Sequence, residues 1–194
     1  MRKIFPIILV LSISQNLYSQ SSNLTICYSI VDSISNTILM ELDERDSCFV
    51  ETKWIEGSDI LKNRFLLNIK EKVRVDFANK NLNTKLILFI DSVGVAYPRI
   101  WRNGLFGSYF VERKITLKGN YRLAINRKNI LKEILYIKSD TVEVEKIGQL
   151  ENSQFAFTQS EIPTEPFVES LVEPVIAIGT AILSVVLFFF VRTQ

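Results

Sequence analysis

The sequence predicts an α+β fold: two helices packed on a four- to five-stranded, mostly antiparallel sheet, followed by one C-terminal transmembrane helix. Three patterns indicate this fold. Isoleucines recur at every fourth position from Ile26 to Ile38, apolar and polar residues alternate over 111–125, and residues 174–191 carry no charge. These are the periods of an amphipathic helix, a half-buried strand and a membrane-spanning helix.

The first 19 residues have the organisation of a cleavable signal peptide. A basic start at 2–3 leads into an apolar run over 4–13, which is too short to cross a bilayer as a helix. Small and polar residues follow, and we place the end of the segment at Ser19, within a few residues because Leu17 is bulkier than cleavage sites prefer. The alternative is an uncleaved anchor or a buried first strand.

The first part of the exported domain predicts two pairs of a helix and a strand. In the first helix, apolar residues four positions apart form one stripe, and Ser22 or Asn23 provides the N-cap. In the second, which follows Gly57, Leu61 and Phe65 begin a similar stripe. The predicted order is a helix over 22–42, a strand over 48–55, a helix from Ser58 or Asp59 and a short strand over 73–77.

The rest of the domain predicts long antiparallel strands. Five consecutive apolar residues at 86–90 indicate a central strand covered on both faces, with Gly94 as a bulge. The apolar set of the alternating segment is broken only by Arg113 and Gly119, so we expect one buried and one solvated face. The predicted order is a strand over 85–97, a loop over 98–108, a strand over 111–125, a turn over 126–129, a strand over 130–137 and, over 140–150, a strand or a short helix.

The charges around the C-terminal apolar run predict its orientation. The run from Pro174 to Val191 is long enough to span the hydrocarbon core, follows four glutamates without a basic residue among them, and is followed by Arg192. The positive-inside rule and the signal peptide both predict that the preceding domain lies outside the cytoplasm. A buried core helix is the alternative.

We therefore expect a single-pass protein of the bacterial inner membrane, with its N-terminal domain in the periplasm and its C-terminus in the cytoplasm. The predicted organisation is a signal peptide over 1–19, a periplasmic domain over 20–150, a linker over 151–170, a transmembrane helix over 171–191 and a cytoplasmic tail over 192–194.

Two small sets of residues predict contacts that stabilise the molecule. Cys27 and Cys48 are the only cysteines, and in an oxidising compartment we predict a disulfide between them, worth roughly 3 kcal/mol on the chain-entropy model. The alternative is two separate buried thiols. Ala177, Ala181 and Ser184 share one face of the transmembrane helix and favour packing of a second helix, although small residues are common in such helices without a partner.

A helix–strand–helix–strand pattern between Ile26 and Phe77 carries a resemblance to a known class of modules. Its most specific part is Gly57-Ser58-Asp59-Ile60-Leu61-Lys62-Asn63-Arg64-Phe65, followed by the strand Val73-Arg74-Val75. This segment resembles the α/β modules of bacterial envelope proteins such as the TolB amino-terminal domain and the LpoB/CsgG-type lipoproteins. The chain departs from the lipoproteins because it lacks a lipobox and carries a C-terminal anchor. The resemblance implies a non-enzymatic envelope module that docks onto other proteins.

The composition argues against most enzyme chemistry. The chain has no histidine, which excludes Ser-His-Asp and Cys-His arrangements, histidine-ligated zinc and the commonest general base. Paired carboxylates are the alternative, with Asp91, Glu112 and Glu133 as candidates that have no motif around them. The stretch 104–107 matches no phosphate loop and is expected to be a hairpin loop. We predict no catalytic residue, no metal site and no cofactor.

Charge is distributed unevenly along the domain. Nine basic residues and one acidic residue lie between Gly94 and Lys132, whereas nine acidic and two basic residues lie between Glu133 and Glu173. One hypothesis is a basic hairpin, edged by aromatic residues within 101–106, that binds an anionic partner. The alternative is a solvated face that the acidic segment of the same chain balances. The predicted anionic-partner face consists of Arg99, Arg102, Arg113, Lys114, Lys118 and Arg122.

The leading functional prediction is a non-catalytic, membrane-tethered periplasmic module that serves as an accessory or assembly subunit of a cell-envelope complex. Its expected partners are the membrane, through one span, and a protein of the envelope, with a homo-oligomer as a further expectation. The alternative is a binding domain that holds an anionic envelope polymer or lipid through the basic hairpin. Nucleic acid is not an expected partner outside the cytoplasm.

Overall fold

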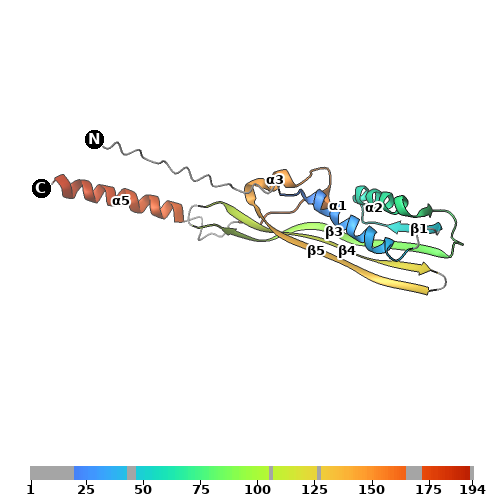
Figure 1. Ribbon diagram of the computed structural model, residues 1–194. Coiled ribbons are helices and arrows are strands. Elements are labelled where there is room, and N and C mark those ends of the chain that lie inside the picture. The colour runs from blue at the N-terminus through green and yellow to red at the C-terminus, as the bar shows by residue number, and fades with distance from the viewer. Residues whose placement is uncertain (1–19, 43–46, 105–106, 126–127, 165–171, 193–194) are drawn as a thin grey trace, which may run out of the picture.

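The computed structural model describes residues 20–42, 47–104, 107–125, 128–164 and 172–192, so the predicted signal peptide lies outside the described residues. Helices and strands follow each other in the predicted order (Figure 1). The elements are α1 (Asn23–Leu39), β1 (Ser47–Lys53), α2 (Asp59–Lys72), β2 (Arg74–Asp76), β3 (Thr84–Arg102), β4 (Tyr109–Ile125), β5 (Lys128–Glu143), the 3-10 turn η1 (Val144–Lys146), α3 (Ile147–Leu150), the 3-10 turn η2 (Ala156–Thr158) and α5 (Val172–Arg192).

The five strands form one sheet in the order β2-β1-β3-β4-β5. β1 runs parallel to both β2 and β3 over short stretches, whereas β3–β4 and β4–β5 are long antiparallel pairs that contain most of the paired residues. With two helices beside this sheet and a separate apolar helix at the C-terminus, the predicted α+β class and the mostly antiparallel sheet are confirmed.

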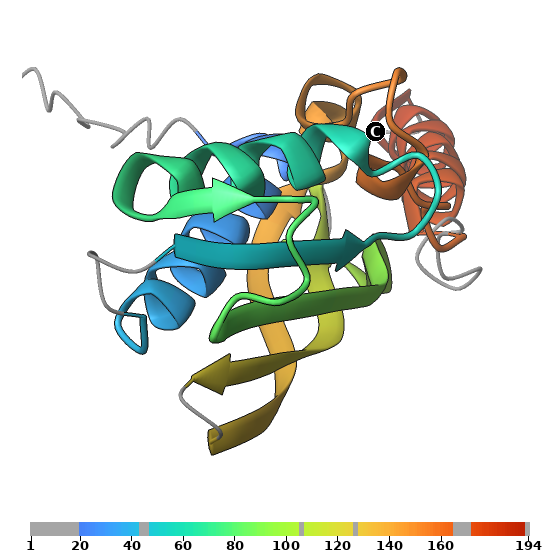
Figure 2. The same ribbon diagram turned by 90° about the vertical axis from the view of Figure 1, so that its right-hand side faces the viewer.

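One face of the sheet, the inner face, carries α1 and α2 (Figures 1 and 2). The isoleucine stripe of α1, of which Ile26 is 2% exposed, shares a single core with inner-face strand residues such as Leu86 and Leu117. Ser22 caps α1 as predicted, because its hydroxyl accepts a hydrogen bond from the backbone N–H of Thr25 at 3.2 Å. The helical period therefore decides which residues of α1 are buried.

The two helices are joined at the surface by a polar cluster. Asp32 of α1 accepts two hydrogen bonds of 2.7 Å from the guanidinium of Arg64 on α2, and Asn68 donates a third at 2.8 Å. The hydrogen bonds from Arg64 lower the pKa of Asp32. Because the pair is largely exposed, it contributes at most about 1 kcal/mol and mainly fixes the register of the helices.

Two strands are longer than the sequence predicted. β3 continues into the loop expected over 98–108, as far as Arg102, and β5 continues to Glu143. Pro98 marked the end of the predicted strand because proline cannot donate to a ladder. In the structure the register shifts between Ala96 and Arg99, so Pro98 lies where the regular pairing is interrupted and the strand resumes after it.

The irregularities of the long strands also differ from the prediction. Gly94 is not a bulge, because it pairs in register with Thr116, and the register shift lies at Asp91 instead. The ambiguous segment 140–150 contains both of the predicted structures in succession, first the end of β5 and then the turn η1 and the short helix α3. Val142 is buried at the end of the strand, and Ile147 and Leu150 are buried three residues apart in the helix. The strand period therefore holds in the first half of the segment and the helical period in the second.

The domain extends beyond its predicted boundary at residue 150. Thr158 is fully buried, and its backbone carbonyl accepts a hydrogen bond of 2.8 Å from Asn23 of α1. Glu151 accepts hydrogen bonds from Tyr97 of β3 at 3.0 Å and from the backbone N–H of Ser160 at 3.1 Å. The predicted linker over 151–170 is therefore wrong for its first ten residues, which pack on the domain.

The C-terminal helix α5 lies apart from the core. Within it, residues 174–191 have a mean hydropathy of 2.6, and no part of this stretch is buried against the described remainder of the chain. The helix extends away from one end of the domain (Figure 1). Its length and composition suffice to cross a membrane, and its unburied apolar surface does not fit the alternative of a buried core helix.

Candidate interaction surface

The outer face of the sheet is the side of β3, β4 and β5 opposite α1 and α2, and none of the helices described in the domain packs on it (Figure 2). The apolar run 86–90 lies across both faces of β3. Leu86, Leu88 and Ile90 are buried on the inner face, whereas Ile87 is half-buried and Phe89 is 36% exposed on the outer face. The prediction of a strand covered on both faces is therefore wrong, because both packing helices lie on the inner side.

The edge strand β5 adds further apolar side chains to the outer face. Leu131, Leu135 and Ile137 are 72%, 60% and 52% exposed. They lie directly opposite Arg122, Lys118 and Thr116 of β4 in the antiparallel register. We call these three residues together with Ile87 and Phe89 the apolar flanks, because they border β4 on both sides.

Three cationic residues occupy the outer face of β4, and two of them, Lys118 and Arg122, lie opposite residues of the apolar flanks. Lys114, Lys118 and Arg122, the cationic row, alternate with buried residues and pair with outer-face positions of β3 and β5. Lys118 and Arg122 are exposed and Lys114 is half-buried. Arg122 donates to the side-chain oxygen of Asn129 at 3.0 Å. These three residues share one surface, as the alternation predicted.

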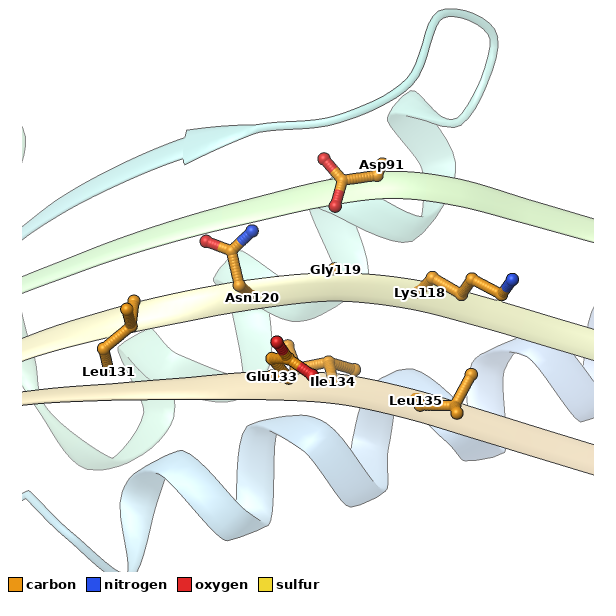
Figure 3. Close-up of a pocket in the computed structure, with 8 residues that line it drawn as sticks. All are labelled: Asp91, Lys118, Gly119, Asn120, Leu131, Glu133, Ile134 and Leu135. Carbon is orange, nitrogen blue, oxygen red and sulfur yellow. The ribbon is translucent and has the colours of Figure 1, made fainter.

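A shallow hollow lies across the three strands beside the cationic row. Figure 3 shows Asp91 of β3, Asn120 of β4 and Glu133 of β5 around it, with Lys118 and Leu135 at one side. Asp91 and Glu133 are two of the three carboxylates considered as a catalytic pair, whereas Glu112 lies further along β4, opposite Arg99. Both are exposed, unlike the water-excluded carboxyl of a general acid. The hollow offers polar groups of both signs on an open surface.

Arg113 is not part of the predicted anionic-partner face. Its side chain is 1% exposed on the inner face, so this residue of the prediction is wrong. Its guanidinium donates to both carboxylate oxygens of Asp140 on β5, at 2.7 Å for the Nε bond, and its Nη1 donates to the Ser21 carbonyl and the Asn23 side-chain oxygen, both at 2.8 Å. The positive charge is thus neutralised inside the domain.

The contacts of Arg113 belong to a larger buried polar network. The amide of Asn23 also donates to the hydroxyl of Tyr97 at 3.3 Å, and that hydroxyl donates to Glu151. Burial raises the pKa of Tyr97 to about 12, so its hydroxyl stays protonated at neutral pH. The network joins the start of α1, three strands and the segment after α3 at one end of the domain.

The other two arginines of the predicted face lie near the β3–β4 hairpin. Arg99 is exposed and pairs with Glu112, whereas Arg102 is half-buried and its Nε donates to the Gly107 carbonyl at 2.9 Å. The predicted set of six therefore divides into the cationic row, two hairpin arginines and one buried arginine. The hairpin loop predicted over 104–107 falls between the end of β3 and the start of β4, and its residues 105–106 lie outside the described part of the chain.

The two cysteines are fully buried, Cys27 on α1 and Cys48 on β1, and the structure joins them by no disulfide. The Cys48 thiol donates to the Phe49 carbonyl at 3.5 Å. Burial raises the pKa of Cys27 to about 12, which keeps the thiol protonated and unreactive at neutral pH. The structure thus has the alternative of two separate thiols rather than the predicted disulfide. Alkylation in denaturant, without reductant, distinguishes the two states by a mass shift.

The small residues of the predicted transmembrane contact lie on exposed helix surface. Ala177, Ala181 and Ser184 belong to α5, and the Ser184 hydroxyl donates to the Thr180 carbonyl at 2.8 Å within the same helix. Packing of a second helix against them stays a prediction. Elsewhere, the described residues contain no group of three or more acidic or cysteine side chains arranged to hold a metal ion.

Sequence reasoning missed the apolar flanks, although a signal for them is present. Residues 130–137 carry apolar side chains at both parities: Ile130 and Ile134 on one side, and Leu131, Leu135 and Ile137 on the other. An edge strand with one solvated face would show polar residues at the second parity. Apolar residues on both sides of a strand indicate a second packing surface, and here that surface faces outward.

Comparisons with known proteins give limited similarity. No protein-family model and no curated protein matches the chain. Among solved structures, the chain is similar to rare lipoprotein B from Shewanella oneidensis, with a TM-score of 0.36 and 13% identity over 72% of this chain and 99% of that chain. It is also similar to a minor lipoprotein from Acinetobacter baumannii, with a TM-score of 0.32 and 8% identity over 67% and 87%. Likeness at these TM-scores assigns neither a family nor a function.

Proposed function

We propose that this chain is a non-catalytic, membrane-tethered module of the bacterial cell envelope that binds a partner protein through the outer face of its sheet. In this proposal α5 spans the inner membrane, the α+β domain lies in the periplasm, and the module acts as an accessory or assembly subunit. The unburied apolar surface of α5 supports the tether. The arrangement of the outer face supports protein binding.

The observation that carries the proposal is the set of apolar flanks on a helix-free sheet face. Three aliphatic residues of one strand are more than half exposed there, with Phe89 on the other side of β4. Covering one such side chain completely is worth about 1.5–3 kcal/mol. Exposed apolar residues grouped on a flat surface, with polar residues among them, are typical of a protein interface.

A partner-binding face is tested by a matched pair of variants in the full-length protein. Leu135 on the outer face and Leu67 on α2 have nearly equal exposure, 60% and 63%. We expect Leu135→Asp to weaken co-purification of a stoichiometric partner in mild detergent by about tenfold or more, because a buried leucine contributes at least one factor of ten. Leu67→Asp should leave it unchanged. Equal effects of the two variants would contradict an outer-face interface.

The cationic row favours a second candidate function, binding of an anionic envelope polymer or lipid. Its three charges lie on one strand face and add at one surface, which attracts polyanions in a salt-dependent way. If this function holds, changing Lys114, Lys118 and Arg122 to Glu abolishes salt-sensitive binding to cell-wall polymer or anionic vesicles. A triple Glu variant of the exposed residues Lys72, Arg74 and Lys80 provides the control with equal charge change and should bind normally.

A further inference from the structure

We propose that the tip of the β3–β4 hairpin, residues 98–104 and 107–112, docks on the interface of the same bilayer that α5 spans. This inference rests on the proposed membrane tether and adds a second contact between the domain and the lipid. Residues 105–106 lie outside the described part of the chain and form no part of the site. In this proposal, aromatic side chains of the tip contact the headgroup region of the lipid.

The tip presents the side-chain types that favour a membrane–water interface. Trp101 and Phe110 are direct cross-strand partners on the outer face, and their rings stack with centroids 6.4 Å apart and an interplanar angle of 24°. The guanidinium of Arg102 lies 5.2 Å from the centroid of the Tyr109 ring. Tryptophan and tyrosine combine an apolar ring with a polar edge, which suits the headgroup level of a bilayer.

The backbone of the tip is held in shape before any lipid is bound. Arg102 is fixed to the Gly107 carbonyl, and the Asn103 N–H donates to the Ser108 carbonyl at 3.1 Å. Gly104 has a φ of +75°, and a Cβ on Gly107 would lie 1.7 Å from the Asn103 carbonyl oxygen. Both positions therefore require glycine. A preformed tip loses little conformational entropy when it binds.

The position of the tip brings it within reach of the bilayer. Figure 1 shows the hairpin at the end of the domain from which α5 extends. The contact of Glu151 with Tyr97 holds residues 151–160 against β3, about 13 Å along the strand from Trp101. From Thr164 to Val172 the chain can span at most about 28 Å when fully extended. The tether thus confines this end of the domain to the neighbourhood of the membrane surface.

The charges at the tip indicate an interaction that does not depend on anionic lipid. Glu112 lies opposite Arg99, and Glu143 lies opposite Phe110. Glu143 also forms an ion pair of 2.6 Å with Lys146. The tip itself has two cations, Arg99 and Arg102, against Glu112, a smaller excess than the three cations of the cationic row, and aromatic burial supplies the main attraction. Binding at the tip should persist in neutral lipid and at high salt, which separates it from the second candidate function.

The two tryptophans of the chain provide a paired test. Trp54→Phe leaves Trp101 as the single reporter, and Trp101→Phe leaves Trp54, which packs on Phe65 with ring centroids 6.1 Å apart. The full-length variants are reconstituted in phosphatidylcholine vesicles that contain lipid brominated high on the acyl chain. We expect bromine to remove roughly half of the Trp101 emission, as for a ring at the headgroup level, and little of the Trp54 emission.

The controls separate failure of the tip contact from failure of the tether. Retention in the vesicles after an alkaline wash reports the tether alone. Retention combined with equal, weak quenching of both tryptophans overturns the tip contact and leaves the tether intact, whereas release by the wash overturns both. In the Trp54→Phe protein, which retains Trp101, the further substitutions Tyr109→Ser and Phe110→Ser should reduce the quenching. Circular dichroism checks that this variant folds. Unchanged quenching in this variant also overturns the proposal.

Discussion

Arg113 is the residue at which the sequence pattern and the local charge count disagree. It occupies a buried parity of β4, between Val111 and Ile115, but it also belongs to a segment rich in basic residues. The alternation was the better guide, because strand geometry sends every second side chain to the same face. A charge at a buried position requires a partner, and Asp140 lies directly opposite Arg113 on β5. That pairing depends on the register of β5, which the sequence did not reveal.

Removing this charge should destabilise the domain. Arg113→Met leaves Asp140, Asn23 and the Ser21 carbonyl without their shared donor, and we expect a loss of about 3 kcal/mol in the free energy of unfolding, measured by urea denaturation of residues 20–164. Lys114→Met, one position along on the outer face, is the control and should change stability by less than about 0.5 kcal/mol. Similar losses in both variants would refute a central role for the buried arginine.

Among the elements, α1, α2 and β4 were predictable because each depends on a local period. The four-residue repeat of α1 and the two-residue repeat of β4 both reappear in the burial of their side chains. The ends of β3 and the position of its bulge were not predictable, because they follow from pairing with β4. Arg99 to Arg102 become a strand only because Tyr109 to Glu112 lie opposite them. Cross-strand pairing stabilises sheets, and a single segment does not reveal its partner.

The bulge of β3 is matched by a glycine on β4. A Cβ on Gly119 would lie 2.2 Å from the Phe89 carbonyl oxygen, whereas a Cβ on Gly94 would meet no atom within 4 Å. We expect Gly119→Ala to destabilise the domain by about 1–3 kcal/mol, because the backbone of β3 must move. Gly94→Ala should be neutral or slightly stabilising, since alanine favours a strand more than glycine does. Thermal unfolding of the two variants measures the difference, and an equal response would count against the close approach.

At the scale of the whole molecule, the sequence predicted the layers but not the open side of the sheet. Which face of β3 the helices cover depends on where α1 and α2 pack, and the run at 86–90 is apolar on both faces. The cationic row was predictable from alternation, whereas the apolar flanks needed the sheet order, which places β5 at an edge. The end of the domain was misplaced because residues 151–160 pack through backbone and side-chain hydrogen bonds that no periodicity reveals.

That misplaced boundary gives a prediction about truncation. A fragment of residues 20–150 lacks Thr158, which is buried beside Asn23, and the Phe157 side chain that packs on the core. We expect it to be less stable than the 20–164 fragment by roughly 2–4 kcal/mol in urea denaturation, from lost apolar burial and lost hydrogen bonds. A fragment of residues 20–160 should match 20–164, because Ser160 is the last residue in the network. Equal stability of all three would restore the predicted linker.

The buried network around Arg113 holds the two ends of the domain close together, beside the β3–β4 hairpin. The chain enters at Ser21 and leaves after Ser160 at this one place. From Arg113, β4 runs on for 12 residues, or about 40 Å, to Ile125. If α5 spans the bilayer as proposed, this end of the domain stays near the membrane surface, while the opposite end can move over a wider range above it. A partner that binds the strand ends near Ile125 would then lie well away from the bilayer.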